Sequence, residues 1–189
     1  MLATDGFAEL LDDLRAMIAE IRAKHEGEPE RLLSTVGEHD SAFHAQWNNL
    51  FGDVLWKGVS HVTLAAYVQK YEVEWPLRFL ACLRGLLSNG RYDPALSQFR
   101  DRGGRLRKGV VIDYIAQGFG SYPAFRTALS QGYSVTLRNL IGHNSYVLDE
   151  AEIKAIDGSY VETYDGVWRR VQALGAIQNS LVLLQSTST

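Results

Sequence analysis

The chain has few cysteines and no excess of positive charge. Its single cysteine, Cys82, excludes an internal disulfide framework and fits a reducing compartment. Because Cys82 lies between apolar neighbours, we expect buried filler rather than a nucleophile. The formal net charge is −3, so the protein as a whole does not attract nucleic acid. Any site for a nucleic acid must therefore be local.

Long apolar runs, a signal peptide and metal-ligand patterns are also missing. No stretch is apolar over the roughly 20 residues that span a bilayer. The N-terminus is acidic and amphipathic, without the basic and apolar regions of a signal peptide. We therefore expect a cytoplasmic protein with no membrane partner. His39, His44 and His61 lack partners at metal-ligand spacing, so we expect no metal and no cofactor.

What the 189 residues do contain is helical periodicity, with a hydrophobic content of 46% that suits one domain over residues 1–189. Apolar residues repeat at intervals of three and four along most of the chain, which predicts a mainly α helical bundle. An N-terminal amphipathic helix is expected within 1–26, with Thr4 or Asp5 as its cap. Further helical segments are expected at 43–59, 62–71, 75–87, 110–117 and 123–131.

The periodicity changes after residue 143. Short β-type segments over 145–164 predict a small β-hairpin or meander at Tyr146–Leu148, Glu152–Ile156 and Ser159–Tyr164. Asp157-Gly158 between β-formers is typical of a two-residue hairpin. An apolar stripe over 165–185 then predicts a C-terminal helix.

Residues 93–108 hold the only dense cationic cluster. Asp93-Pro94 predicts a short helix that runs into this cluster, whose basic residues flank a pair of glycines. Basic side chains at this density attract phosphates through counterion release. Arg105, Arg107 and Lys108 are therefore candidates for RNA binding. A solvated loop paired with nearby acids explains the cluster equally well.

The stretch from Tyr133 to Tyr146 carries the clearest chemical pattern. A short helix over 133–143 would turn its aliphatic residues, Val135, Leu137, Leu140 and Ile141, towards the core. Arg138, Asn139 and His143 would point elsewhere. Asn139 and His143 are four residues apart and share a helix face, and the long side chain of Arg138 can reach across.

Arg138-Asn139-Leu140-Ile141-Gly142-His143 resembles the signature of the HEPN superfamily, small helical domains that are often metal-independent ribonucleases. That signature is an Arg, commonly followed by a polar residue, and then a His after four to six residues. The resemblance implies a metal-independent endoribonuclease in which Arg138, Asn139 and His143 are catalytic. One alternative is a structural helix that ends at Gly142, with Arg138 in a surface ion pair. Another is a non-catalytic HEPN module that binds nucleotides, RNA or a protein.

The chemistry of RNA cleavage suits these side chains. The 2′-hydroxyl loses a proton and attacks phosphorus, and imidazole moves protons near neutral pH. A guanidinium forks onto phosphate oxygens. Since one chain supplies one such imidazole, the family implies a homodimer with the active site at its interface, with the first and last helical stripes as the expected seam. It also implies a toxin or phage-defence setting with an antitoxin partner. Tyr146 could stack on a base or simply pack in a strand.

Overall fold

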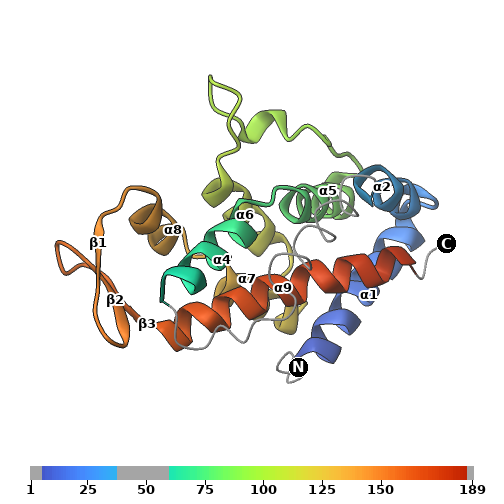
Figure 1. Cartoon of the computed structure of the whole chain (residues 1–189). Coiled ribbons are helices and arrows are strands. Elements are labelled where there is room, and N and C mark those ends of the chain that lie inside the picture. The colour runs from blue at the N-terminus through green and yellow to red at the C-terminus, as the bar shows by residue number, and fades with distance from the viewer. Residues whose placement is uncertain (1–5, 38–59, 187–189) are drawn as a thin grey trace.

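The computed structural model describes residues 6–37 and 60–186, which are mainly helical with one small antiparallel sheet (Figure 1). The mainly α architecture predicted from sequence is confirmed, as is a small β-element after the Arg138–His143 helix. The α-helices are α1 Phe7–Lys24, α2 Glu28–Gly37, α4 Ser60–Glu72, α5 Trp75–Asn89, α6 Lys108–Gly118, α7 Pro123–Gly132, α8 Val135–Gly142 and α9 Tyr164–Ser186.

The long helix α9 runs through the molecule and packs against α1, α4 and α7 (Figure 1). Its expected stripe is buried, from Val167 through Leu174 to Leu184. The stripe of α1 is buried with it in one core cluster, from Leu10 to Ile21. Both apolar stripes are thus covered by the chain's own helices.

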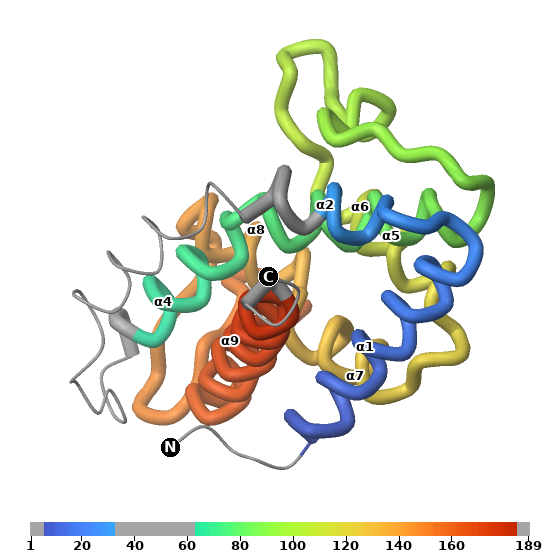
Figure 2. Tube along the Cα trace, turned by 90° about the vertical axis from the view of Figure 1, so that its right-hand side faces the viewer, coloured from blue at the N-terminus to red at the C-terminus, as the bar shows by residue number. Residues whose placement is uncertain are grey.

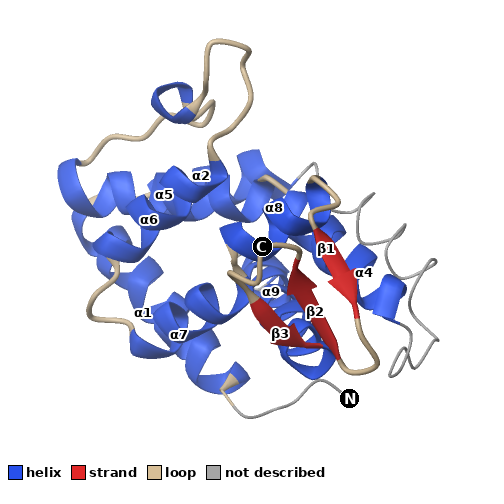
Figure 3. Ribbon diagram, turned by 90° about the vertical axis from the view of Figure 1, so that its left-hand side faces the viewer, coloured by secondary structure: helices blue, strands red, loops and turns tan. Residues whose placement is uncertain are grey.

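The sheet is a meander with the strand order β1-β2-β3, formed by Tyr146–Leu148, Glu152–Ala155 and Val161–Thr163 (Figure 3). Antiparallel pairing places Val147 opposite Lys154, and Lys154 opposite Val161. Alternation along β2 then buries Ile153 while the row through Val147 and Val161 stays exposed.

The expected two-residue hairpin at Asp157-Gly158 is wrong. The amide of Ala155 donates to the carbonyl of Tyr160 at 2.8 Å, which closes a four-residue turn over 156–159. The Asp157 carboxylate accepts hydrogen bonds from both the amide and the hydroxyl of Ser159. These side-chain bonds stabilise the longer turn.

Several helix boundaries also differ from the expectation. The N-cap of α1 is Gly6 rather than Thr4 or Asp5, which lie outside the described residues. Helix α2 was not predicted, and Pro29 lies in its first turn, where the missing amide is not needed. The expected helix over 43–59 lies outside the described residues, as do His39 and His44 and the side chain of His61.

The helix predicted from Asp93 is wrong. Residues 91–107, which we call the arm, project from the helical body with only a short 3-10 turn at Ser97–Phe99 (Figures 1 and 2). The Asp93 carboxylate accepts from the amides of Ala95 and Ser97 at 2.9 and 2.7 Å. Leu96 has a φ of 52°, which breaks helical continuation. The helix-capping pattern of the sequence closes a turn instead.

Cys82 is buried in α5, and burial raises the pKa of its thiol to about 12. This placement confirms the expected packing role. Among the residues described, no helix has the length and apolar character to cross a membrane.

Candidate active site on helix α8

Helix α4 fixes the start of α8. The Tyr67 hydroxyl accepts a hydrogen bond from the Ser134 amide at 2.9 Å and donates one to the Ser134 carbonyl at 3.0 Å. Burial raises the pKa of Tyr67, so the hydroxyl keeps the proton that it donates. The Ser134 hydroxyl caps the helix by accepting from the amide of Leu137. Leu137 is fully buried, so α8 is held by packing as well.

The end of α8 is equally defined. The amide of Asn144 donates to Ile141, and the amide of Ser145 donates to Leu140. Asn144 takes the left-handed conformation with φ 52°, so the turn is a Schellman motif in which asparagine replaces the usual glycine. His143 is the C-cap residue of this turn, and its side chain is exposed. The helix therefore presents His143 at a fixed backbone position.

Glu72 connects α8 to two other helices. Its carboxylate accepts a hydrogen bond from Arg138 Nε at 2.6 Å and forms an ion pair with Lys108 Nζ. Lys108 also donates to the carbonyl of Glu72 at 2.7 Å, at the C-terminal end of α4. Burial alone would raise the pKa of the Glu72 carboxyl, but the hydrogen bonds from Lys108 and Arg138 hold it below its usual value. Glu72 therefore stays ionised between two cations.

These contacts orient the Arg138 guanidinium along α8. With Nε on Glu72, Nη1 lies 3.5 Å from Asn139 Oδ1. A Cβ on Gly142 would lie only 3.2 Å from the same Nη1, so glycine leaves room for the guanidinium. Arg138 thus reaches towards the residue that precedes His143. Its side chain is 36% exposed, which leaves its outer edge open to a ligand.

The outer part of the arm, residues 100–107, is held near this ion-pair network on both sides. Arg100 Nη2 pairs with Glu74 at 3.4 Å, and Lys108, which follows the arm, is held by Glu72. Within this part, Arg100 and Leu106 form an antiparallel β-bridge. The Asp101 carboxylate closes the tip by accepting from the amides of Gly103 and Arg105 at 2.8 and 2.9 Å. The tip is therefore a hydrogen-bonded turn with a defined shape.

The arm and the start of α8 enclose a cleft of about 580 Å³, which we call the motif cleft. Arg138 and Asn139 line it from α8, and Arg105 and Lys108 line it from the other side. Two segments that the sequence singled out separately therefore meet in one place. The charged side chains of the lining are Arg100, Arg105, Lys108, Arg138, Glu72, Glu74 and Asp101.

The three candidate RNA-binding cations have different environments. Arg107 donates to the carbonyls of Gln98 and Phe99 and so braces the arm. Lys108 is only 11% exposed and is occupied by Glu72. The Arg105 guanidinium is exposed and makes no hydrogen bond or ion pair within the described residues. Of the three, Arg105 is the one available to a ligand.

Three sequence candidates lie outside the lining of the motif cleft: His143, Tyr146 and Arg107. The imidazole of His143 has no hydrogen-bond partner in the parts of the chain that the structure describes. Tyr146 is half-buried against the core, which favours its packing role. Val135 differs from its expected core position because its side chain is 43% exposed and lines the cleft.

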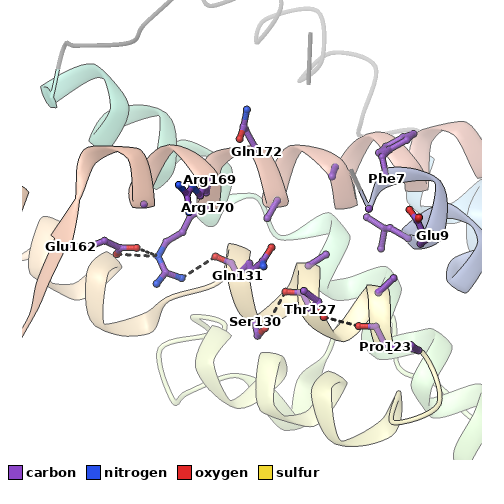
Figure 4. Close-up of a pocket in the computed structure, with 17 residues that line it drawn as sticks. Phe7, Glu9, Pro123, Thr127, Ser130, Gln131, Glu162, Arg169, Arg170 and Gln172 are labelled. Carbon is purple, nitrogen blue, oxygen red and sulfur yellow. Dashed lines mark hydrogen bonds and ion pairs between the residues drawn. The ribbon is translucent and has the colours of Figure 1, made fainter. Parts of the chain in front are cut away.

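A larger hollow of about 830 Å³ lies between α1, α7 and α9 (Figure 4). Arg170 in its wall is bonded to Glu162 at 2.7 and 3.0 Å and to the Gln131 carbonyl at 2.9 Å. Thr127 donates to a carbonyl of its own helix. Among the described residues that line this hollow there is no histidine. We call it the α7–α9 groove.

No cluster of metal-binding side chains occurs within residues 6–37 and 60–186. Comparison of the chain with protein-family models, curated proteins and solved structures gave no match.

The site contains residues that the sequence did not reveal. Glu72 and Tyr67 come from α4, more than sixty residues before Arg138 and Ser134. Glu74 similarly meets Arg100 across 26 residues. Nothing local distinguishes these side chains from other residues at the end of an amphipathic helix. Only tertiary packing brings them to the site.

Proposed function

We propose that the protein is a metal-independent endoribonuclease of the HEPN type, with Arg138, Asn139 and His143 as its catalytic residues. The observation that carries the proposal is the placement of Arg138. Glu72 orients its guanidinium along α8 towards His143, while its outer edge borders the motif cleft. A phosphate at that edge would meet a pre-oriented donor, which lowers the cost of binding the transition state.

The reaction is an internal transfer. The 2′-oxygen forms a bond to phosphorus, its proton passes to a base, and the bond from phosphorus to the 5′-oxygen breaks. A general acid then supplies the proton that the 5′-oxygen needs, leaving a 2′,3′-cyclic phosphate and a 5′-hydroxyl. His143 is suited to one of these two proton transfers. Arg138 would stabilise the charge on the phosphate oxygens, and Asn139 supports it through Oδ1.

Cleavage needs two proton transfers, and His143 of one chain can serve only one of them. We therefore propose a homodimer with the active site at its interface. The apolar stripes of α1 and α9 are buried within the chain and are unavailable as the seam. Exposed His143 would instead face the partner's copy of α8. Light scattering at micromolar concentration should give twice the mass of the chain, and a stable monomer would contradict this part of the proposal.

A second candidate function is a non-catalytic module that binds RNA, nucleotides or a protein. It is favoured by one observation: within the described residues nothing orients the His143 imidazole. If the enzyme reading holds, the HEPN resemblance points to a toxin or phage-defence effector that acts on cellular RNA. An antitoxin protein would then be a natural partner.

Cleavage in the presence of a chelator separates the two candidates. Purified protein should cut single-stranded RNA in EDTA, and His143→Ala should lower the rate by roughly 10²-fold or more because proton transfer is lost. His25→Ala is the matched control, since His25 lies beside Gly90 at the other end of the helical body. The enzyme proposal fails if cleavage needs magnesium, or if both histidine variants behave alike.

A further inference from the structure

The cationic side chains of the motif cleft that are open to a ligand come from two sides of it. Arg100 is not among them, because its guanidinium donates hydrogen bonds to the carbonyls of Ala95 and Gly104 and to the Glu74 carboxylate. Lys108 is held by Glu72. The remaining cationic groups are Arg105 on the arm and the outer edge of Arg138 on α8. An anion in the cleft would therefore bridge the arm and helix α8.

The lining of the cleft also includes apolar side chains. Leu106 on the arm and Val135 in the first turn of α8 both line it. Val135 is 43% exposed although its helix neighbour Leu137 is fully buried. Gly109 also lines the cleft, and a Cβ there would lie 3.2 Å from Val135. A cleft that offers both apolar side chains and guanidinium groups matches a nucleotide, which has a flat base and an anionic phosphate.

We propose that the motif cleft is a subsite for one unpaired ribonucleotide next to the phosphate that is cleaved. The scissile phosphate, which is attached to this nucleotide, contacts Arg105 and the outer edge of Arg138. The base of the nucleotide lies against Val135 and Leu106. This assignment rests on the proposed function for the position of the scissile phosphate. The subsite itself is a binding site, and its test does not need catalysis.

The shape of the subsite selects single strands. The cleft volume of about 580 Å³ suits one nucleotide, and walls on two sides would separate its base from its neighbours. A nucleotide in a duplex can enter only by giving up its base pair and its stacking. The arm is already shaped by the β-bridge and the Asp101 turn, so little order has to be gained on binding.

Two variants distinguish this subsite from general electrostatic attraction of RNA to the protein. One places a negative charge inside the cleft, and the other places the same charge beside it. Val135→Glu puts a carboxylate against the expected base and phosphate. Thr136→Glu adds the same charge one residue further on, at an exposed position that does not line the cleft. Both lie in the first turn of α8, where a negative charge favours the helix, so both variants should fold.

The measurement is the affinity for a labelled oligouridine strand at fixed ionic strength, made in a His143→Ala background so that the strand stays intact. Val135→Glu should weaken binding about 10-fold, while Thr136→Glu should change it less than about 2-fold. A duplex of equal length should bind at least about 10-fold more weakly than the single strand. Equal effects of the two variants, or equal affinity for duplex and single strand, would overturn the subsite.

This outcome is separable from the ribonuclease proposal. If the wild-type protein cuts no RNA but the Val135→Glu and Thr136→Glu variants differ as expected, the subsite stands and the catalytic proposal falls. If the wild-type protein cuts RNA in EDTA and the two variants bind alike, the catalytic proposal stands and the subsite falls.

Discussion

The motif cleft and the α7–α9 groove differ in size and in chemistry. The groove is the larger hollow, at about 830 Å³ against 580 Å³. Its wall combines alanines and other apolar side chains with charged ones from Glu9, Glu162, Arg169 and Arg170. Arg170 is bonded to Glu162 and a backbone carbonyl. The smaller cleft gathers charged side chains from α4, the arm and α8.

This contrast teaches that the volume of a hollow says less about function than the state of its polar groups. A buried polar group that is already bonded has little to offer a ligand. In the motif cleft, Lys108 and Arg138 both pair with Glu72, and this network holds the Arg138 guanidinium in place. Arg105 and the outer edge of Arg138 remain available there. Substitutions at Glu72, Arg105 and Arg169 would show whether that difference is functional.

Among the variants that compare the two hollows, the largest effect is expected at Glu72. Glu72→Gln keeps an oxygen that can accept from Arg138 Nε but removes the charge between Arg138 and Lys108. RNA affinity should rise a few-fold because a negative charge leaves the cleft. The cleavage rate at saturating RNA should fall on the order of 10- to 10²-fold because Arg138 is no longer held in one orientation. Single-turnover rates on RNA, together with affinities for a 2′-O-methyl analogue that cannot be cleaved, would resolve the two effects.

Glu74→Gln is the matched control for this prediction. It makes the same chemical change two residues away, where the partner is Arg100 rather than Arg138. Its cleavage rate should stay within about 2-fold of the wild-type rate. A Glu72→Gln protein that loses rate and affinity together would show that Glu72 only supports the fold.

A smaller effect is expected from exposed arginines in the two hollows. Arg105→Ala should weaken RNA binding about 3- to 10-fold and make the logarithmic salt dependence shallower by about 0.7, as for one lost phosphate contact on a single strand. Arg169→Ala removes the same charge from the α7–α9 groove and should change neither quantity. Equal losses would mean that RNA is drawn by overall charge, and the contrast between the hollows would disappear.

The helices that could be predicted from sequence are those with strong local signals. Helix α5 has Pro76 in its first turn and is followed by Gly90, whose φ of 68° favours glycine. The prediction of a helix in the arm was wrong for a local reason too. Asp93-Pro94 resembles a helix start, but the Asp93 carboxylate closes a turn and Leu96 takes a positive φ.

The candidate site shows the same division between local and distant information. Arg138, Asn139 and His143 lie within six residues, so their spacing is readable from the sequence. Their surroundings are not readable, because Glu72 reaches Arg138 across 66 residues and only tertiary packing joins them. The role of Lys108 also depends on α4, because its ammonium group binds the carbonyl and the carboxylate of Glu72 at the end of that helix and does not face a ligand.

The most direct test of the central claim is the chemical identity of the RNA ends formed in EDTA. If α8 cleaves RNA by attack of the 2′-hydroxyl, mass spectrometry should find 2′,3′-cyclic phosphates and 5′-hydroxyls from the wild-type protein. His143→Ala should leave the RNA largely intact. Products with 3′-hydroxyl and 5′-phosphate ends, or cleavage that appears only when magnesium is added, would contradict the account.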